Sequence, residues 1–402
     1  MKRTSRWISG NHVTPAFLHC AAILLLTEMA RSAFLISFLP AFAKERHITL
    51  AAVGVAISVH YLADTLIKVL AGYVLDRFPA RLILNIFLLL GLLGLFVSYG
   101  VSAPWAVVLG AGLIGIGVSP VWLLCLSEIR EDSRGSQMGS VYTIWLVSLG
   151  LGPVAVNFLI DRSYALSFWL LAGCWSAGWL LAAMKRIDFS SRRLLGDTIP
   201  FKQQMRQIGS KLAQMKPLVP GMIVQTLAAG LLVPVLPSFA SEYLALDYSG
   251  YSIVLMAGGC MTVLLLIPMG RLADKWGHKW LLIAGFGALA ACLGLLIYSR
   301  QMFSTMLLAV CLGAAYAAVL PAWNAILSHF VPVEQKATGW GVLSGIEGIG
   351  VILGPILGGW MAESFDETVT VGISALLLFG IMLFYWIRPV RQHQPGQYGQ
   401  QG

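Results

Sequence analysis

A ten-residue loop occurs twice in this chain and relates its two halves. It reads Gly-x-x-x-Asp-Arg/Lys-x-x-x-Arg/Lys at residues 72–81 and again at residues 270–279, with 198 positions between the copies. Each copy follows the second long apolar stretch of its half. Other landmarks repeat at nearly the same separation: Pro40 with Pro237, Glu45 with Glu242, Pro120 with Pro321, and Gly152-Pro153 with Gly354-Pro355. A register kept over such a length indicates an internal duplication.

The composition places most of the chain in lipid. Of the 402 residues, 58% are hydrophobic and 11% are charged, which is more apolar surface than a soluble core can hide. The apolar runs are long and unbroken, as helices require and the short alternating strands of a barrel do not. The sequence predicts an all-α membrane protein with transmembrane helices near residues 16–43, 49–75, 80–100, 103–129, 135–160, 163–184, 217–243, 249–273, 278–298, 302–330, 335–363 and 367–388.

Basic residues predict the orientation. They gather on one side of the membrane: Lys2, Arg3, Arg6, Arg77, Arg81, Arg130, Arg134, Lys275, Lys279, Arg388 and Arg391. The opposite loops are short and carry Glu242, Asp247, Glu363, Asp366 and Glu367. The positive-inside rule therefore predicts a multi-pass cell-membrane protein with both termini in the cytoplasm and no cleavable signal peptide. The net charge of +9 is spread over short loops, which argues against a nucleic-acid partner.

The chain divides into two six-helix halves. We expect an N-terminal half at 1–184, a basic cytoplasmic linker at 185–216, and a C-terminal half with a short cytoplasmic tail at 217–402. Residues 201–214 of the linker fit either an amphipathic helix on the anionic leaflet or a solvated tether. All six cysteines fall inside spans, so we expect neither a disulfide framework nor a metal site, and no cofactor.

Ionisable residues inside the spans are confined largely to the first half. Glu28 and Arg31 share one face of the first span, and His60, Asp64 and Lys68 form an i, i+4, i+8 stripe along the second. The corresponding positions of the second half are uncharged: Gln225 for Glu28, Ala228 for Arg31 and Thr262 for Asp64.

Two interpretations of these charges are open. Each charge costs at least ~2.5–3.5 kcal/mol at mid-bilayer, so the groups must face water or one another. They could be ion pairs that hold the first two spans together, Glu28 with Arg31 and Asp64 with Lys68. Apolar side chains would do that without a desolvation penalty, so we favour a functional role in binding, with Glu28 or Asp64 carrying a proton.

Aromatic residues and an apolar wall suggest the kind of substrate. Trp122 and Trp145 lie in spans that border the cavity of such a bundle, where a ring can stack on a sugar, although either could simply pack or anchor at the interface. The facing surface of the second half, including Leu232, is almost wholly apolar, and Glu347, at the repeat position of Trp145, is its exception. A cavity with one polar and one apolar side favours an amphiphile, so we expect a lipid.

The duplicated halves and the repeated loop resemble the major facilitator superfamily over essentially the whole chain. The resemblance implies its fold of two six-helix halves and a gating role for the loop. Gly72 and Gly270 would allow close helix approach, and Asp76 and Asp274 would pair with a cation or a helix N-terminus. The basic members Arg77, Arg81, Lys275 and Lys279 could instead serve only as topology determinants. A Gly-Pro run from Gly348 to Gly359 is similar to the signature of antiporters in this superfamily, but it says little about transport direction.

Five shorter motifs carry a closer resemblance. They are the segments 27–31, 58–64, 117–122, 131–142 and 320–324. They resemble the proton-coupled glycolipid flippases of lipoteichoic acid synthesis in Gram-positive bacteria. That resemblance implies outward movement of a diglucosyl-diacylglycerol in exchange for protons, with the proton gradient as energy source and lipoteichoic acid synthesis proteins as partners. The headgroup and proton residues would then be Glu28, Arg31, Asp64, Trp122 and Trp145, whereas Lys68 and Glu347 depart from what we expect of that family.

Two other functions stay open at this stage. A multidrug/proton antiporter shares the fold and accepts apolar substrates. A membrane-embedded lipid enzyme or receptor would need a nucleophile and base or a metal set, and the spans offer only His19 and His60 near mid-bilayer. We therefore expect a transporter and not an enzyme.

Overall fold

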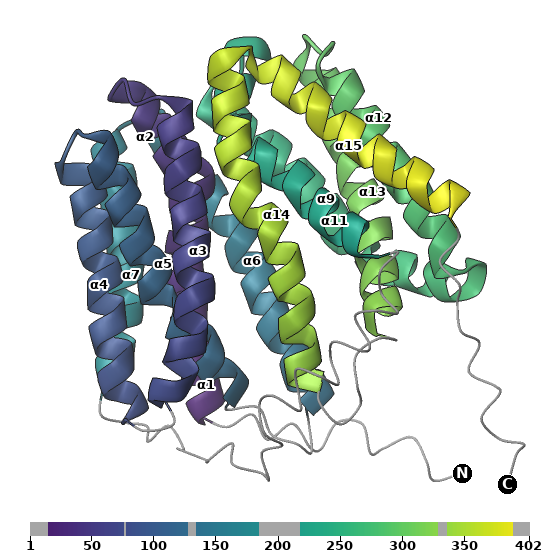
Figure 1. The fold of residues 1–402 in the computed structure, drawn as a ribbon. Helices are drawn as coiled ribbons and strands as arrows, with labels where there is room; N and C mark the ends of the chain where they lie inside the picture. Colours follow the sequence, from purple (N-terminus) through teal and green to yellow (C-terminus); the bar gives the residue numbers. More distant parts are fainter. Residues whose placement is uncertain (1–14, 76–77, 128–133, 185–217, 329–335, 389–402) are drawn as a thin grey trace, which may run out of the picture.

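The computed structural model describes residues 15–75, 78–127, 134–184, 218–328 and 336–388. Within these ranges the chain is a bundle of long helices without strands (Figure 1). The first half contains α1 (Pro15–Ala33), η1 (Phe34–Phe38), α2 (Leu39–Glu45), α3 (Leu50–Leu75), α4 (Ala80–Gly100), α5 (Pro104–Ser127), α6 (Arg134–Ile160) and α7 (Tyr164–Ala183). The second contains α9 (Val219–Leu232), α10 (Leu236–Ser238), η3 (Phe239–Tyr243), α11 (Tyr248–Trp276), α12 (His278–Leu296), α13 (Met302–Ser328), α14 (Lys336–Ser364) and α15 (Glu367–Ile387).

The membrane-spanning helices confirm the predicted all-α fold. In the described residues, 11 helices are long and apolar enough to cross a bilayer, and the count reaches 12 when one bent pair is taken as a single span. Most boundaries agree with the apolar runs to within a few residues. The expected linker at 185–216 lies outside the described residues, so the division into domains stays a prediction.

The bent pair corrects the expectation of one continuous helix over residues 217–243. α9 and the segment Leu236–Tyr243 meet at 46° across a break of three residues. The cause is local, because Pro234 and Pro237 each lack the N–H that would bond one turn back. The first span carries Pro40 alone and absorbs it with the π-helical turn η1 just before it, so that span stays continuous.

Each half has its own apolar core. In the first, Phe34, Phe38 and Phe168 are almost fully buried, and the Trp175 indole donates to the backbone oxygen of Leu88 at 2.8 Å. In the second, Phe286 and Trp323 pack as a perpendicular pair 6.4 Å apart. The cores are separate, so each half can move as a unit.

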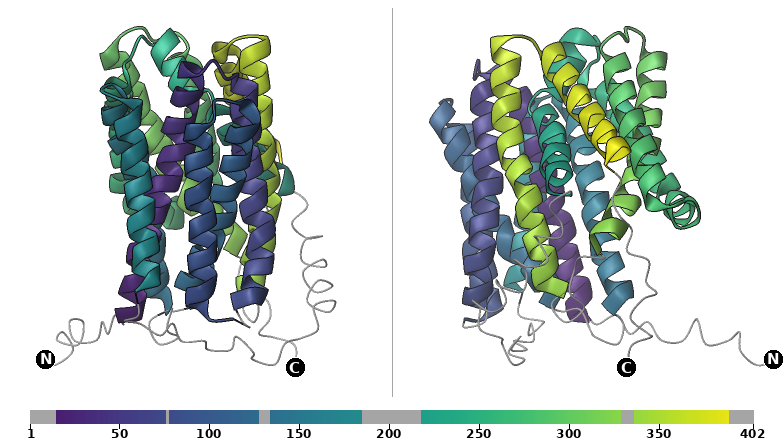
Figure 2. Two further views of the ribbon diagram at one scale, coloured as in Figure 1. Left: turned by 90° about the vertical axis from the view of Figure 1, so that its left-hand side faces the viewer. Right: turned by 45° about the vertical axis from the view of Figure 1, so that its right-hand side comes forward.

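α14 is packed tightly on two sides by its glycines. A Cβ at Gly350 would lie 2.3 Å from the backbone oxygen of Ile223 in α9, and one at Gly358 would lie 2.1 Å from that of Leu231. On the other side, a Cβ at Gly359 would lie 2.2 Å from the backbone oxygen of Leu50 in α3. α14 therefore joins its own half to the first half along the seam with α3, which both views show side by side (Figures 1 and 2).

Polar contacts join the halves at the end of the bundle opposite the start of α1 (Figure 1). Glu363 at the end of α14 accepts a hydrogen bond from the backbone N–H of Ala51 in the first turn of α3, at 3.1 Å. Asp161, just after α6, accepts from the backbone N–H groups of Tyr248 and Ser249 in the first turn of α11, at 3.1 and 2.7 Å. The two carboxylates are related by the duplication, since each stands eight residues after the proline of its Gly-Pro pair.

A third contact at the same end is an ion pair between Lys44 and Glu242, whose Nζ and Oε1 atoms lie 2.7 Å apart. Toward the end where α1 begins, α3 and α14 diverge (Figure 1). The bundle is thus held together at one end by contacts between its halves.

The repeated loop is only partly described. Asp76 and Arg77 lie outside the described residues, and so do the surroundings of Gly72 and the side chain of Asp274. The gating contacts expected of this loop therefore stay a prediction. The expectation that Gly270 allows a close approach of two helices is wrong. A Cβ at this position would make only an ordinary 3.7 Å contact with Pro321.

The basic members of the loop that are described make contacts within their own half. Arg81 donates to the backbone oxygen of Ala183 at the C-terminus of α7, which favours a cation. Lys279 lies 5.1 Å from the ring centroid of Trp280, whereas Lys275 is exposed.

Candidate substrate and proton site

Glu28 and Arg31 form a buried ion pair on α1. Their spacing of one turn brings the side chains together, and Arg31 donates through Nε at 2.8 Å and through Nη2 at 2.6 Å, both to Oε2 of Glu28. Both residues are buried, with 5% and 8% of their surface exposed. The two bonds use Nε and Nη2, so Nη1 of Arg31 remains for another acceptor.

His60 supplies that acceptor from α3. Its Nδ1 lies 3.0 Å from the backbone oxygen of Ala111, and a carbonyl can only accept, so Nδ1 carries the hydrogen. In the neutral ring Nε2 is then an acceptor, and it lies 3.5 Å from Nη1 of Arg31. A neutral His60 thus links the arginine of α1 to α5.

Asp64 has a cation of its own one turn further along α3. Nζ of Lys68 donates to Oδ2 at 2.6 Å, and the Ser119 hydroxyl lies 3.0 Å from Oδ1. Asp64 is buried, whereas 38% of the Lys68 side chain is exposed. Lys68 can therefore leave the carboxylate at little desolvation cost, which Arg31 cannot.

Small residues on α5 make this arrangement possible. Ala111, Gly115 and Ser119 repeat every fourth residue and face the stripe on α3. A Cβ at Gly115 would lie only 2.4 Å from the backbone oxygen of His60, so α3 and α5 are in backbone contact. That contact brings Ala111 and Ser119 within reach of His60 and Asp64.

Aromatic rings gather on α5 and α6. The centroids of Trp122 and Trp145 lie 6.5 Å apart at 65°, and Tyr142 lies 5.4 Å from Trp122 at 77°. The two tryptophans are half-buried and Tyr142 is exposed. The three rings present edges and faces of the kind that pack against the C–H groups of a sugar.

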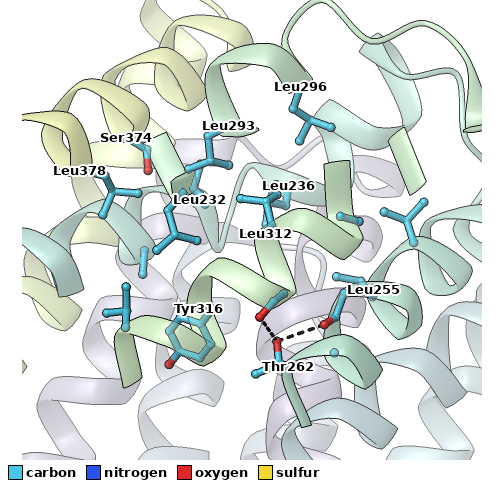
Figure 3. Close-up of a pocket in the computed structure, with 18 of the residues that line it drawn as sticks. Leu232, Leu236, Leu255, Thr262, Leu293, Leu296, Leu312, Tyr316, Ser374 and Leu378 are labelled. Atoms are coloured by element: carbon cyan, nitrogen blue, oxygen red, sulfur yellow. Dashed lines mark hydrogen bonds between the residues drawn. The ribbon is translucent and has the colours of Figure 1, made fainter. Parts of the chain in front are cut away.

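Glu347 belongs to a different place, in the second half. Oε1 of Glu347 accepts from Nε1 of Trp323 at 3.0 Å and from Nε2 of Gln225 at 3.2 Å. These three residues line a cavity of about 700 Å³ whose described lining comes entirely from α9 to α15. Leu232 lines this cavity, as expected of the apolar wall (Figure 3).

The structure thus resolves the predicted site residues into three groups. Glu28, Arg31 and His60 are joined by contacts and the Asp64–Lys68 pair follows one turn further along α3, Trp122 and Trp145 form an aromatic group, and Glu347 stands in the opposite half. Whether they bind substrate or protons stays a prediction.

Sequence reasoning missed Ser119, Tyr142 and Trp323 as members of these groups. Two of them could have been found from spacing. Ser119 lies one turn after Gly115, and Trp323 stands two residues after the repeat of Pro120, as Trp122 does.

Comparison with known proteins gives one family and several relatives. A model of the Major Facilitator Superfamily matches residues 20–208 and 218–401. The chain is 29% identical over 377 residues to the proton-coupled antiporter flippase LtaA of Staphylococcus saprophyticus, covering 92% of this chain and 94% of that protein. It is 28% identical over 374 residues to the protein of the same name from Staphylococcus aureus, covering 92% and 93%.

Solved structures agree on the fold. A mutant of the nucleoside transporter NupG superposes with a TM-score of 0.76 at 16% identity, covering 92% of this chain and all of that one. A POT family transporter in complex with a thioalcohol-conjugated peptide gives a TM-score of 0.68 at 12% identity, covering 92% and 95%. Identities this low support the fold alone.

Proposed function

The chain belongs to the major facilitator superfamily, and we propose that it is a proton-coupled flippase that moves a glycolipid from the inner to the outer leaflet. The substrate we propose is a diglucosyl-diacylglycerol, the anchor lipid of lipoteichoic acid, in a Gram-positive cell membrane. The observation that carries this proposal is the division of the molecule. Two neighbouring groups of ionisable residues, Glu28–Arg31–His60 and Asp64–Lys68, lie in α1 and α3 of one half, and an apolar cavity lies in the other.

The headgroup would bind on the polar side. Arg31 offers a planar set of donors to sugar hydroxyls, and Glu28 and Asp64 offer acceptors. Trp122 and Trp145 would supply the stacking faces. The acyl chains would lie along the leucines of the opposite cavity, where burial of each methylene contributes about 0.8 kcal/mol.

Proton exchange would act through the two ion pairs. A proton on Glu28 neutralises the acceptor of both Arg31 bonds, and this frees the guanidinium for the headgroup. A proton on Asp64 releases the half-exposed Lys68 in the same way. Either carboxylate can couple the gradient to substrate binding, because its partner cation differs in freedom between the two protonation states.

Alternating access would then move the halves as units. With both termini in the cytoplasm, the end held by Asp161, Glu363 and Lys44 faces outward and the diverging end faces inward. In that orientation α3 and α14 diverge toward the cytoplasmic leaflet, from which the substrate would be taken.

A flipping assay tests the proposal. The protein is reconstituted in liposomes with a fluorescent diglucosyl-diacylglycerol, and the fraction accessible from each side is followed with and without a proton gradient. We expect gradient-dependent flipping that is lost when the gradient is collapsed. Resistance to cationic drugs in cells, with no flipping of the glycolipid in liposomes, would instead support a multidrug/proton antiporter.

Ligand binding separates a glycolipid from a free sugar. Trp122→Ala and Trp145→Ala should weaken binding of the diglucosyl lipid but spare diacylglycerol, whereas Leu232→Asp should weaken both. Free diglucose should compete poorly, since it lacks the apolar contact. Strong competition by the free disaccharide, together with indifference to Leu232→Asp, would point to a sugar transporter.

A further inference from the structure

The cavity of the second half has the size and lining of a ligand site. Its volume of about 700 Å³ falls within the range that holds drug-sized molecules. Leucine is the commonest residue of the wall, and Leu232, Leu293 and Leu312 border the same space (Figure 3). One group of polar residues, contributed by α9, α13 and α14, lies around Glu347.

Glu347 is the one charged residue among the described residues that line this cavity. Its hydrogen-bond donors are neutral: the indole of Trp323 and the amide of Gln225. The Thr226 hydroxyl donates at 2.8 Å to the backbone oxygen of Glu347 and ties that turn of α14 to α9. The position is therefore fixed by three contacts, and none of them supplies a positive charge.

The other two carboxylates of the membrane interior show what Glu347 lacks. Glu28 is paired with Arg31 and Asp64 with Lys68, each at 2.6 Å. No cation of the described residues stands within ion-pair distance of Glu347. Both of its described side-chain bonds end on Oε1, which leaves Oε2 for a further partner.

Aromatic rings border the same cavity. Trp323 donates to the carboxylate directly, and Tyr316 and Phe286 are further lining residues. An aromatic face attracts a cation within about 6 Å of its centroid, and most strongly where water is excluded. A carboxylate, nearby rings and a leucine wall together match a molecule with a charged head and an apolar tail.

We propose that this cavity binds amphiphiles that carry a single positive charge, with Glu347 as the counter-ion and the alkyl chain along the leucines. The ligand class goes beyond the proposed glycolipid, because a diglucosyl headgroup has no charge to give the carboxylate. A cationic amphiphile would occupy the space proposed for the acyl chains, so the two ligands should compete. The inference does not rest on flipping, because it concerns binding to one half of the molecule.

Direct binding to the full chain in lipid nanodiscs tests this. The charged probe is radiolabelled dodecyltrimethylammonium, and dodecanol is the neutral probe with the same chain. We expect Glu347→Gln to weaken binding of the charged probe at least tenfold and to leave dodecanol unchanged, because the amide keeps the shape and loses the charge. Glu367→Gln, the same change in the first turn of α15 and away from the cavity, should leave both affinities at the wild-type value.

The thermal midpoint of Glu347→Gln shows whether this variant folds. A second variant keeps the test valid if it does not. Glu347→Asp keeps the charge, and it should retain the preference for the charged probe over the neutral one. Equal affinity of wild type and Glu347→Gln for the charged probe would overturn the proposal, and so would an equal loss for both probes. Glycolipid flipping is measured separately, so a wild-type protein that flips the glycolipid but binds the charged probe no better than the neutral one refutes this inference alone.

Discussion

At the scale of single residues, the Glu28–Arg31 pair makes a sharp prediction about stability. Arg31→Ala strands a buried carboxylate, so it should cost about 3–5 kcal/mol of unfolding free energy. Glu28→Gln combined with Arg31→Ala should cost less than the sum of the single changes, because the stranded charge is gone. Chemical unfolding of the wild type, the two single variants and the double variant measures the interaction energy between the two side chains. Additive costs would mean that the two side chains do not interact in the folded protein.

Flipping per folded molecule decides whether Arg31 does more than stabilise. We expect Arg31→Ala to lower flipping beyond its effect on the amount of folded protein, since it also removes a donor for sugar hydroxyls. Unchanged flipping per folded molecule would make Arg31 a structural residue.

The carboxylates are tested by neutral replacements of the same shape. Glu28→Gln or Asp64→Asn should abolish proton-driven flipping, because the amide mimics the protonated acid. Asp64→Asn should leave the thermal midpoint within a few degrees, because Lys68 is partly exposed, whereas Glu28→Gln leaves the buried Arg31 without its partner and should lower it. Downhill exchange of lipid without a gradient should persist. Glu367→Gln provides the matched control, and proton-driven flipping in both site variants would rule out these carboxylates as the coupling groups.

At the scale of helices, the glycines of α14 predict which positions tolerate a methyl group. Gly350→Ala and Gly358→Ala place a Cβ against backbone oxygens of α9, which cannot yield as a flexible side chain can, so each should cost about 1–3 kcal/mol. Gly348→Ala lies on the same helix with nothing within 4 Å, and it should be neutral or slightly stabilising. Thermal midpoints in detergent compare the three. A loss at Gly348 equal to that at Gly358 would mean that helix flexibility, and not packing, explains the glycines.

The helices themselves were largely predictable from sequence, because a bilayer demands about 20 apolar residues for each span and the duplication supplied a second copy of every landmark. The break after α9 was not predicted. Its signal, Pro234 beside Pro237, is in the sequence, but the first span carries Pro40 without breaking. Local propensity alone does not say whether a π-helical turn will absorb a proline.

The candidate site was predictable where it depends on one helix and was missed where it depends on two. Helical spacing gave the Glu28–Arg31 and Asp64–Lys68 pairs. The contact of Ser119 with Asp64 depends on how closely α5 approaches α3, which Gly115 permits. The pairing of Glu347 with Trp323 likewise depends on how α13 and α14 are placed in the bundle, for which one sequence offers no register.

At the scale of the whole molecule, two duplicated carboxylates hold the halves together at one end. Asp161 and Glu363 each bond the first turn of a helix in the other half, where an anion contributes about 0.3–1 kcal/mol. Together the two carboxylates contribute about 0.6–2 kcal/mol, so Asp161→Asn with Glu363→Gln should shift the population toward the conformation open at that end by roughly three- to thirtyfold. Asp366→Asn is the control, because Asp366 caps Thr368 within its own half.

Spin labels are placed at the N-terminal end of α3 and at the C-terminal end of α14. The distances between them measure that shift. We expect longer distances to gain population in the double variant and not in Asp366→Asn. An unchanged distribution would mean that the packing of Gly54 and Gly359 closes this end without help from the carboxylates.

The pairing of charges has an electrical consequence. A membrane potential of 100 mV is worth about 2.3 kcal/mol for each elementary charge that crosses the field. Glu28 with Arg31 and Asp64 with Lys68 carry no net charge as pairs, so moving the first half through the field does no work on them. With an uncharged glycolipid, the current that accompanies transport would then count protons alone. Among the described residues of the membrane interior, Glu347 is a carboxylate without a paired cation, so a cationic amphiphile bound there would cancel its charge and change the voltage dependence of the transporter.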